Sequence, residues 1–176
     1  MSTTATTSSN NIANALIAEL ENESKTTRKV LERVPTEKFD WKPHEKSMTF
    51  IRLATHVAEM HGWTKNTVED PELDFAKFTD YKPFVPKDNA ELVGHFEKNL
   101  TLAIETLKKA SDDIWHEPWS LRNGETIYFT MPKIVVMRSM VLNHIVHHRG
   151  QLSVYLRLND IPVPEMYGPS ADEGQM

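Results

Sequence analysis

The chain has 176 residues, no cysteine, and a net charge of −5 at pH 7 when the histidines are neutral. This length suffices for one domain with a sizeable core. The absence of cysteine excludes disulfides, cysteine-ligated zinc, iron–sulfur clusters and a cysteine nucleophile, and an acidic chain without a basic stripe has no electrostatic footprint for a nucleic-acid partner.

The first ten residues are rich in serine, threonine and asparagine, and we expect them to be disordered. They have neither the basic start nor the apolar block of a signal peptide. No apolar run approaches the roughly 20 residues that a membrane-spanning helix requires. We therefore expect a cytoplasmic protein with no membrane partner, in which residues 11–176 form a single domain.

Apolar residues recur at helical spacing in four segments, and local signals mark where these segments begin or end. Pro35 ends the first, Ser47 is expected to cap the second, and Asp88 caps the third through a variant of the capping box. The fourth tolerates Pro132 in its first turn. The predicted helices cover about residues 11–33, 48–68, 89–110 and 130–158.

Four amphipathic helices, each with one apolar stripe, predict an all-α four-helix bundle. Two connections differ from simple turns. Residues 71–87 hold three prolines and several aromatic residues, which indicates a long loop. Residues 111–130 contain Asn123-Gly124 between apolar runs, which predicts a short β-hairpin between the third and fourth helices. Both connections are candidates to shape a pocket entrance, and residues 161–176 are expected to be an irregular tail.

The fourth predicted helix contains three of the eight histidines in one five-residue stretch, at His144, His147 and His148. His144 and His148 are one turn apart on one face, and such a pair can bind a single divalent metal. His56 lies on the apolar face of the second predicted helix. Metal sites in bundles are built from inward-facing side chains of different helices. The sequence therefore predicts a metal site of His56, His144 and His148 with an open position.

Other interpretations of these residues stay open. The three histidines could instead be hydrogen-bonded core residues, although burying imidazoles without a partner or metal costs free energy. His147 points about 60° away from His144, and it could support the ligands from outside, compete with them, or pack between helices. Gln151 and Tyr155 share the ligand face and are candidates to orient a bound water or substrate, or they form a polar pair in the core.

Two further histidine patterns are weaker evidence for a metal or catalytic site. His56 and His61 superficially resemble the zincin signature, but they are five residues apart and diverge by about 140°, so we expect His61 on another face. Glu91 and His95 lie one turn apart at the start of the third predicted helix and are expected to form a solvated pair. No Glu-x-x-His motif occurs, which disfavours a di-iron carboxylate site.

The region around His144 resembles the DinB (damage-inducible) superfamily, and the resemblance extends over about residues 12–170. The core of the match is a string that begins at His144 and continues through His147-His148-Arg149-Gly150-Gln151-Leu152. The supporting segments are Trp41-Lys42-Pro43, Ser47, Leu53-Ala54-Thr55-His56-Val57, Tyr155-Leu156-Arg157-Leu158, Pro162-Val163-Pro164 and Tyr167-Gly168.

The resemblance implies a four-helix bundle with up-down-down-up connectivity, a divalent-metal site that carries over to His56, His144 and His148, and homodimers. Characterised relatives include metal-dependent transferases and isomerases that use a low-molecular-weight thiol, such as bacillithiol, mycothiol or glutathione. A coordinated thiol is deprotonated. A thiol that arrives as cosubstrate also agrees with a chain that has no cysteine of its own.

The first functional hypothesis is therefore a metal-dependent thiol S-transferase that acts on small electrophilic molecules. Zinc or nickel is the first candidate for the metal and iron a further one, because three imidazoles suit several divalent ions. The alternative is a non-catalytic metal- or ligand-binding stress protein of the DinB family. A third hypothesis is an interaction scaffold whose histidines are structural.

Overall fold

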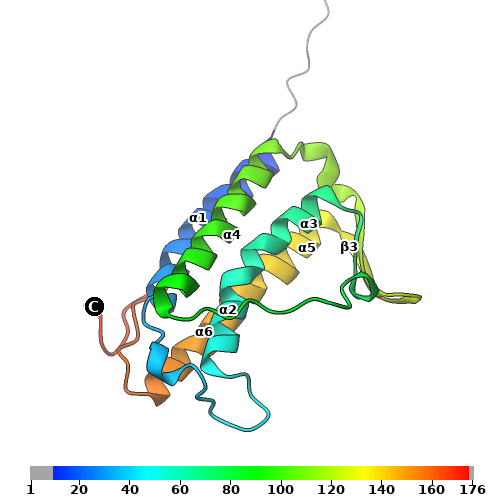
Figure 1. The fold of residues 1–176 in the computed structure, drawn as a ribbon. Coiled ribbons are helices and arrows are strands. Elements are labelled where there is room, and N and C mark those ends of the chain that lie inside the picture. Colours follow the sequence, from blue (N-terminus) through cyan, green and yellow to red (C-terminus); the bar gives the residue numbers. More distant parts are fainter. Residues whose placement is uncertain (1–9, 175–176) are drawn as a thin grey trace, which may run out of the picture.

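The structure, a computed structural model, describes residues 10–174. The segment predicted to be disordered, residues 1–10, lies outside this range except for Asn10. Four long helical segments and one small sheet dominate the described part of the chain (Figure 1). The helices are α1 (Asn11–Leu31), α2 (Phe50–Glu59), α3 (Trp63–Glu69), α4 (Asn89–Lys109), α5 (Lys133–Val136), the π-helical η5 (Met137–Leu142) and α6 (Asn143–Leu158), and the short 3-10 turns are η1 (Thr36–Lys38), η2 (Met60–Gly62), η3 (Phe75–Lys77) and η4 (Asp112–His116).

Two of the four long segments are not uniform α-helices. The turn η2 separates α2 from α3, and the wider η5 separates α5 from α6. Apolar side chains from all four segments meet in one core, in which Leu20, Leu53, Phe96 and Ile145 are almost fully buried. Burying one such side chain stabilises the fold by about 1.5–3 kcal/mol. The apolar stripes of the sequence thus face one another, as the helical spacing predicts.

Helix starts follow local hydrogen bonds, and these correct two predicted boundaries. Asp88 caps α4 as predicted, since its Oδ1 accepts from the backbone N of Glu91 at 2.8 Å. The second helix is capped by Thr49 rather than Ser47, because Thr49 Oγ1 accepts from the backbone N of Arg52. The fourth helical segment begins at Lys133 rather than near residue 130, because residues up to Pro132 pair in a sheet instead.

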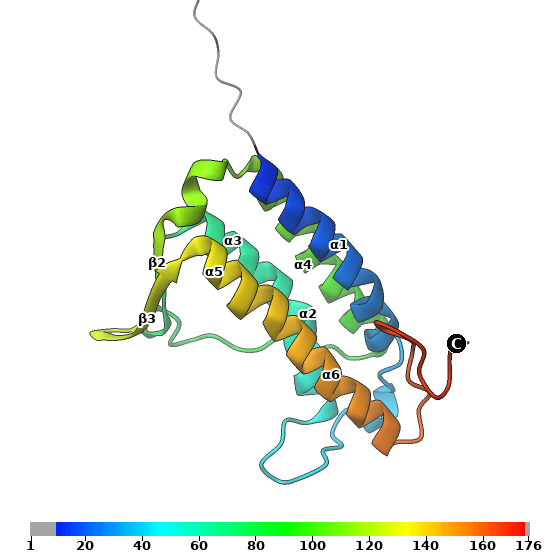
Figure 2. The ribbon, with the colours of Figure 1, turned by 180° about the vertical axis from the view of Figure 1, so that it is seen from behind.

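The sheet contains a strand that the sequence did not predict. The strands β2 (Pro118–Asn123) and β3 (Thr126–Pro132) pair antiparallel around Gly124, whose φ is +57°, and β1 (Glu72–Asp74) pairs parallel with β2. The buried carboxylate of Asp74 accepts from the backbone N of Gly124 at 2.9 Å. Part of the predicted loop 71–87 is therefore a strand, fastened to the hairpin at the end of the bundle where α3 ends and α5 begins (Figure 2).

A buried ion pair joins the last helix to the first. The guanidinium of Arg149 on α6 is 1% exposed and donates to Oε2 of Glu23 on α1 at 2.6 Å. It also donates to the backbone O of Glu23, to the hydroxyl of Thr27 and to the hydroxyl of Tyr167. An unpaired charge at this depth would be costly. These contacts therefore fix which side of α6 faces α1.

Replacing Glu23 with Ala should lower the free energy of unfolding by about 3 kcal/mol, because it leaves the buried Arg149 without its counter-ion. This is the lower end of the usual range, since the backbone O of residue 23 and the Thr27 hydroxyl still accept from the guanidinium. Urea denaturation measures the change. The matched control is Glu21→Ala at an exposed position of the same helix, expected to stay within about 0.5 kcal/mol; equal losses in both variants would contradict the prediction.

Candidate functional site

Three histidine side chains meet between α2 and α6. One ring nitrogen from each of His56, His144 and His148 lies within 4.8 Å of the others. The centroid of the His56 ring is 5.2 Å from that of His144 and 4.7 Å from that of His148. The structure thus brings together the three residues that the sequence selected, although they lie up to 92 positions apart in the chain (148 − 56).

Helix geometry places two of these rings side by side. His144 and His148 project from adjacent turns of α6, and their Nε2 atoms are 2.8 Å apart. The π-helical η5 ends directly before α6. Because a π-helix hydrogen-bonds one residue further along the chain than an α-helix, it changes the rotation of the helix that follows, and such segments are frequent at functional sites. Here η5 ends two residues before His144.

Each ring is held by an oxygen atom at the nitrogen that points away from the cluster. The three Nδ1 contacts are His56 with Glu59 Oε1 at 3.0 Å, His144 with Met140 O at 3.3 Å, and His148 with Gln151 Oε1 at 2.7 Å. An oxygen acceptor fixes the single proton of a neutral imidazole on Nδ1, which leaves a lone pair on Nε2. Metal-binding histidines are typically supported in this way.

The inner nitrogens are consequently available to bind a cation. With protons on both outer nitrogens, the two Nε2 atoms 2.8 Å apart would face each other lone pair to lone pair. Burial lowers the pKa of His148 to about 4, and burial together with the neighbouring His56 lowers the pKa of His144, so protonation is disfavoured at neutral pH. Two nitrogens bound to one ion at about 2.1 Å each lie about 3.0 Å apart at a right angle and about 3.4 Å apart in a tetrahedron. The donor set therefore fits a divalent metal.

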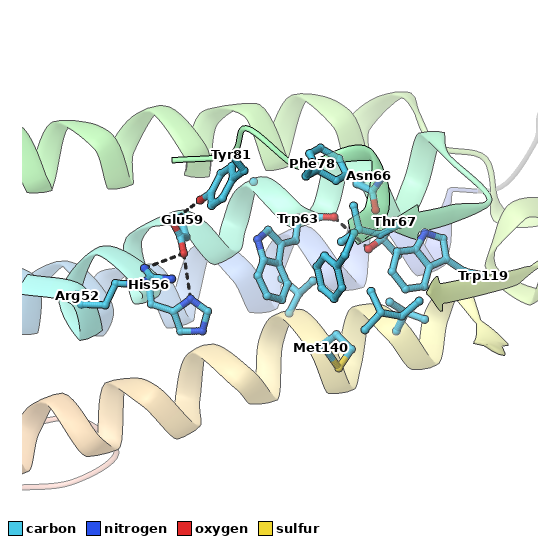
Figure 3. A pocket seen from close by; sticks show the side chains of 16 residues that line it. Arg52, His56, Glu59, Trp63, Asn66, Thr67, Phe78, Tyr81, Trp119 and Met140 are labelled. Carbon is cyan, nitrogen blue, oxygen red and sulfur yellow. Dashed lines mark hydrogen bonds and ion pairs between the residues drawn. The ribbon is translucent and has the colours of Figure 1, made fainter. Parts of the chain in front are cut away.

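The carboxylate of Glu59 is central to the contacts of His56. Its Oε1 also accepts from Arg52 at 3.1 Å, and its Oε2 accepts from the hydroxyl of Tyr81 at 3.3 Å (Figure 3). Burial alone would raise the pKa of Glu59, but the hydrogen bond with His56 and the charge of Arg52 lower it. Sequence reasoning missed this residue, although a separation of three on one helix makes His56 and Glu59 neighbours.

A cavity of about 450 Å³ extends from His56 toward the small sheet (Figure 3). Arg52 and Glu59 lie at its His56 end, and the rest of its wall is mostly aromatic and aliphatic. As predicted, the 71–87 segment and the hairpin contribute to this wall. The lining residues from these two segments are Leu73, Phe75, Phe78, Tyr81, Trp119 and Leu121, and those from η5 are Met140 and Val141.

The remaining sequence candidates divide into two groups. Gln151 contacts His148, as described, and His147 is exposed with its ring 4.8 Å from that of His148. Tyr155 belongs to the core instead, which is the alternative that the sequence left open. Its hydroxyl donates to the backbone O of Met48 at 3.1 Å, and its ring packs edge-on against Trp41. It is thus engaged with the connector before α2 and does not orient a ligand at the histidines.

The pair expected at Glu91 and His95 does not form. Glu91 Oε2 accepts from the backbone N of Lys87, whereas His95 stacks on Phe84 and contacts Asn99. The start of the helix offers the carboxylate a nearby free backbone N–H, which replaces the predicted partner.

The DinB family model matches residues 1–175. The chain belongs to the DinB family. Two solved DinB-like structures share this fold. The structure from Bacillus cereus ATCC 10987 is 20% identical, covers 88% of this chain and 97% of its own, and has a TM-score of 0.65. YjoA from Bacillus subtilis is 15% identical, covers 87% of this chain and 97% of its own, and has a TM-score of 0.67. No curated protein matches the sequence. Across residues 10–174 of this DinB-family chain, every helix is too short or too polar to cross a bilayer.

His61 lies on another face of the second helical segment, as predicted, and faces the core of this DinB-family bundle. It is 1% exposed, its Nε2 is 3.3 Å from Ser24 Oγ, and its ring packs edge-on against Phe96. Burial, reinforced by the charge of Arg149, lowers its pKa to about 4. In the unfolded chain the pKa is about 6.5. The unfolded state therefore binds the extra proton first, and stability present above pH 6.5 is lost as the pH falls toward 4.

Between pH 6.5 and 5, His61 should account for a loss of unfolding free energy of roughly 1 kcal/mol per pH unit. His61→Gln should flatten the dependence of stability on pH by that amount, whatever its effect at pH 7. Urea denaturation at several pH values measures the slope. The exposed Thr101 on α4 supplies the control, because Thr101→Gln changes no titratable group and should keep the slope of the parent. An unchanged slope in His61→Gln would contradict the assignment.

Proposed function

We propose that this DinB-family chain binds a divalent metal through His56, His144 and His148 and acts as a metal-dependent thiol S-transferase on small electrophiles. The observation that supports the metal site best is the orientation of the three rings. Each Nδ1 is engaged by an oxygen, so that the Nε2 lone pairs converge between α2 and α6. Zinc or nickel is the first candidate, and iron a further one.

The cavity beside His56 supports a catalytic role over a structural one. A bound metal would supply a Lewis acid that keeps a coordinated thiol in its thiolate form. The chain's own contribution is positional. Glu59 holds the His56 ring, Gln151 holds the His148 ring, and the apolar wall of the cavity excludes water from the space that His56 faces. Exclusion of water strengthens the electrostatic interactions inside such a site.

The finer features of the family resemblance belong to this proposal as well. We infer one domain over residues 11–176 with up-down-down-up connectivity, which the colours along α1, α2, α4 and α6 in Figure 1 support. A homodimer, a role in stress response, a small-molecule substrate and a cytoplasmic location follow the same resemblance. The net charge of −5 speaks against a nucleic-acid partner.

One observation favours the non-catalytic alternative, a metal- or ligand-binding stress protein. Polar side chains in the cavity wall already have partners, as when Asn66 donates to Asp70 at 2.8 Å and the Thr67 hydroxyl donates to the backbone O of Trp63. A general acid or base must be free to reach substrate. A panel of thiols and electrophiles that gives no turnover with metal-loaded protein would favour this alternative.

Replacing His148 with Ala should remove both bound metal and thiol transfer, because two imidazoles seldom hold a divalent ion in a protein site. Elemental analysis of protein purified without a histidine tag measures the metal bound per chain. Turnover is measured with a thiol and an aromatic electrophile. His147→Ala is the matched control and should retain both. Parent protein with less than about a tenth of an equivalent of metal would favour the scaffold hypothesis, and equal activity without metal would refute the transferase mechanism.

Glu59→Gln should weaken metal affinity by about 10- to 100-fold, the usual effect of removing a carboxylate that supports a ligating histidine. The amide keeps the size of the side chain but loses the charge that favours the Nδ1 proton of His56. Competition with a metal-binding dye measures the affinity. Glu69→Gln, at an exposed position of α3, should leave it unchanged; a Glu59 variant with the parent affinity would show that the carboxylate does not act through His56.

A further inference from the structure

We propose that the cavity beside His56 binds an uncharged, elongated aromatic molecule whose single metal-coordinating group lies at the His56 end. This names the substrate class of the proposed function, and the position of the coordinating group rests on that function. The inference starts from how polarity is distributed along the cavity. Arg52, His56 and Glu59 gather at one end, whereas Trp119 lies at the other with Met140 between them (Figure 3).

Away from His56 the described wall offers a polar ligand little besides the buried indole Nε1 of Trp119, which has no hydrogen-bond partner. Its aliphatic side chains come from β1, β2, α5 and η5, and its two polar residues donate within the chain, Asn66 to Asp70 and Thr67 to a backbone O. A ligand with several polar groups there would lose more hydrogen bonds to water than this single donor replaces. The body of the ligand must therefore be apolar.

The charges in the wall cancel. Among the described residues that line this cavity, Arg52 and Glu59 are the only lysine, arginine, aspartate or glutamate side chains, and they form an ion pair at 3.1 Å. Glu59 is additionally occupied by His56 and Tyr81. A charged ligand would find no free counter-ion and would give up its hydration. Away from the histidines, the wall of the cavity consequently selects against anions and cations alike.

Aromatic side chains at the edge of the cavity point to an aromatic ligand. Phe75, Phe78 and Tyr81 line it and yet are 48%, 49% and 59% exposed. Trp63 and the buried Trp119 complete an aromatic wall. A group of exposed apolar side chains beside a cavity marks a binding site, and rings favour offset or edge-on contacts with other rings.

The size of the cavity sets the scale of the ligand. Its volume of about 450 Å³ lies within the range of small-molecule sites. It corresponds to on the order of fifteen water molecules at about 30 Å³ each. A molecule with two fused or linked rings fits this space, whereas a single ion or a short polar thiol leaves most of the wall uncovered.

Two fluorescent probes with one skeleton test charge selectivity. N-phenyl-1-naphthylamine is uncharged, and 8-anilino-1-naphthalenesulfonate adds a sulfonate to the same rings. Fluorescence titration of the full chain should give a micromolar Kd for the uncharged probe and a Kd at least about tenfold higher for the sulfonate. Absent binding of the uncharged probe, or equal affinities for the two, would overturn the proposal.

Variants locate the probe. Leu121→Trp fills the cavity and should weaken binding of N-phenyl-1-naphthylamine at least about tenfold, whereas Val154→Trp, at an exposed position of α6, is the matched control and should not. Phe78→Ala removes an exposed ring at the edge of the cavity, with little risk to folding, and should weaken binding about threefold or more. Parent affinity in both Leu121→Trp and Phe78→Ala would place the probe elsewhere and overturn the proposal.

Competition separates this inference from the metal site. In cobalt(II)-loaded protein, 2-naphthalenethiol should displace the probe at a concentration at least about tenfold below that of 2-methylnaphthalene, and in His148→Ala the two should be equal. Equal displacement in the loaded parent would overturn the position of the coordinating group. If the parent chain binds the probe but takes up no metal, the apolar site is supported and the proposed metal function is refuted, so the two can fail independently.

Discussion

The rotation of α6 about its own axis is the constraint on which the site depends. Arg149 is buried against α1, where it is paired with Glu23. Neighbouring residues of a helix point about 100° apart, so fixing Arg149 toward α1 also fixes the direction of His148. A rotation that released the histidines from α2 would expose or unpair the guanidinium. Because breaking a buried ion pair costs several kcal/mol, the ion pair keeps the rings in place.

Interruptions in two helical segments make room beside the histidines. The turn η2 on one side and η5 on the other both contribute lining residues to the cavity, among them Gly62 and Met140. Gly62 also leaves room for the side chain of Asn99 on α4, since a Cβ at this position would lie 2.8 Å from Oδ1 of Asn99. Both departures from regular helical geometry therefore border the cavity.

The sequence was most informative where the determining interactions are local. Helical spacing, the Asp88 cap and the i, i+4 pair of His144 and His148 all lie within a few residues of chain, and each was predicted correctly. His56 could be added because an apolar stripe predicts which side of a helix faces the core. The strand β1 could not be predicted, because three residues are too few to show the alternation of a strand and the partner strand begins only at Pro118.

The missed cap and the missed carboxylate have different causes. Ser47 and Thr49 are both good caps, and the choice between them depends on where Trp41 and Phe39 accept the backbone N–H groups of the first helical turn. That arrangement is tertiary and leaves no local signal. Glu59 did leave a signal, at three residues from His56, but a carboxylate on the surface of a helix usually has a solvated partner. Only the burial of its side chain distinguishes it.

Glu59 also connects the ligands to the mouth of the cavity, and the strengths of its bonds rank these roles. Its contact with His56 is buried on both sides and charge-assisted, which is worth about 1.5–3 kcal/mol. Its contact with Tyr81 is longer, and Tyr81 is 59% exposed, so water replaces that bond at little cost. Loss of the Tyr81 contact would therefore leave the contact between the carboxylate and the His56 ring intact. Access to the cavity and orientation of the histidine are physically separable, although one side chain takes part in both.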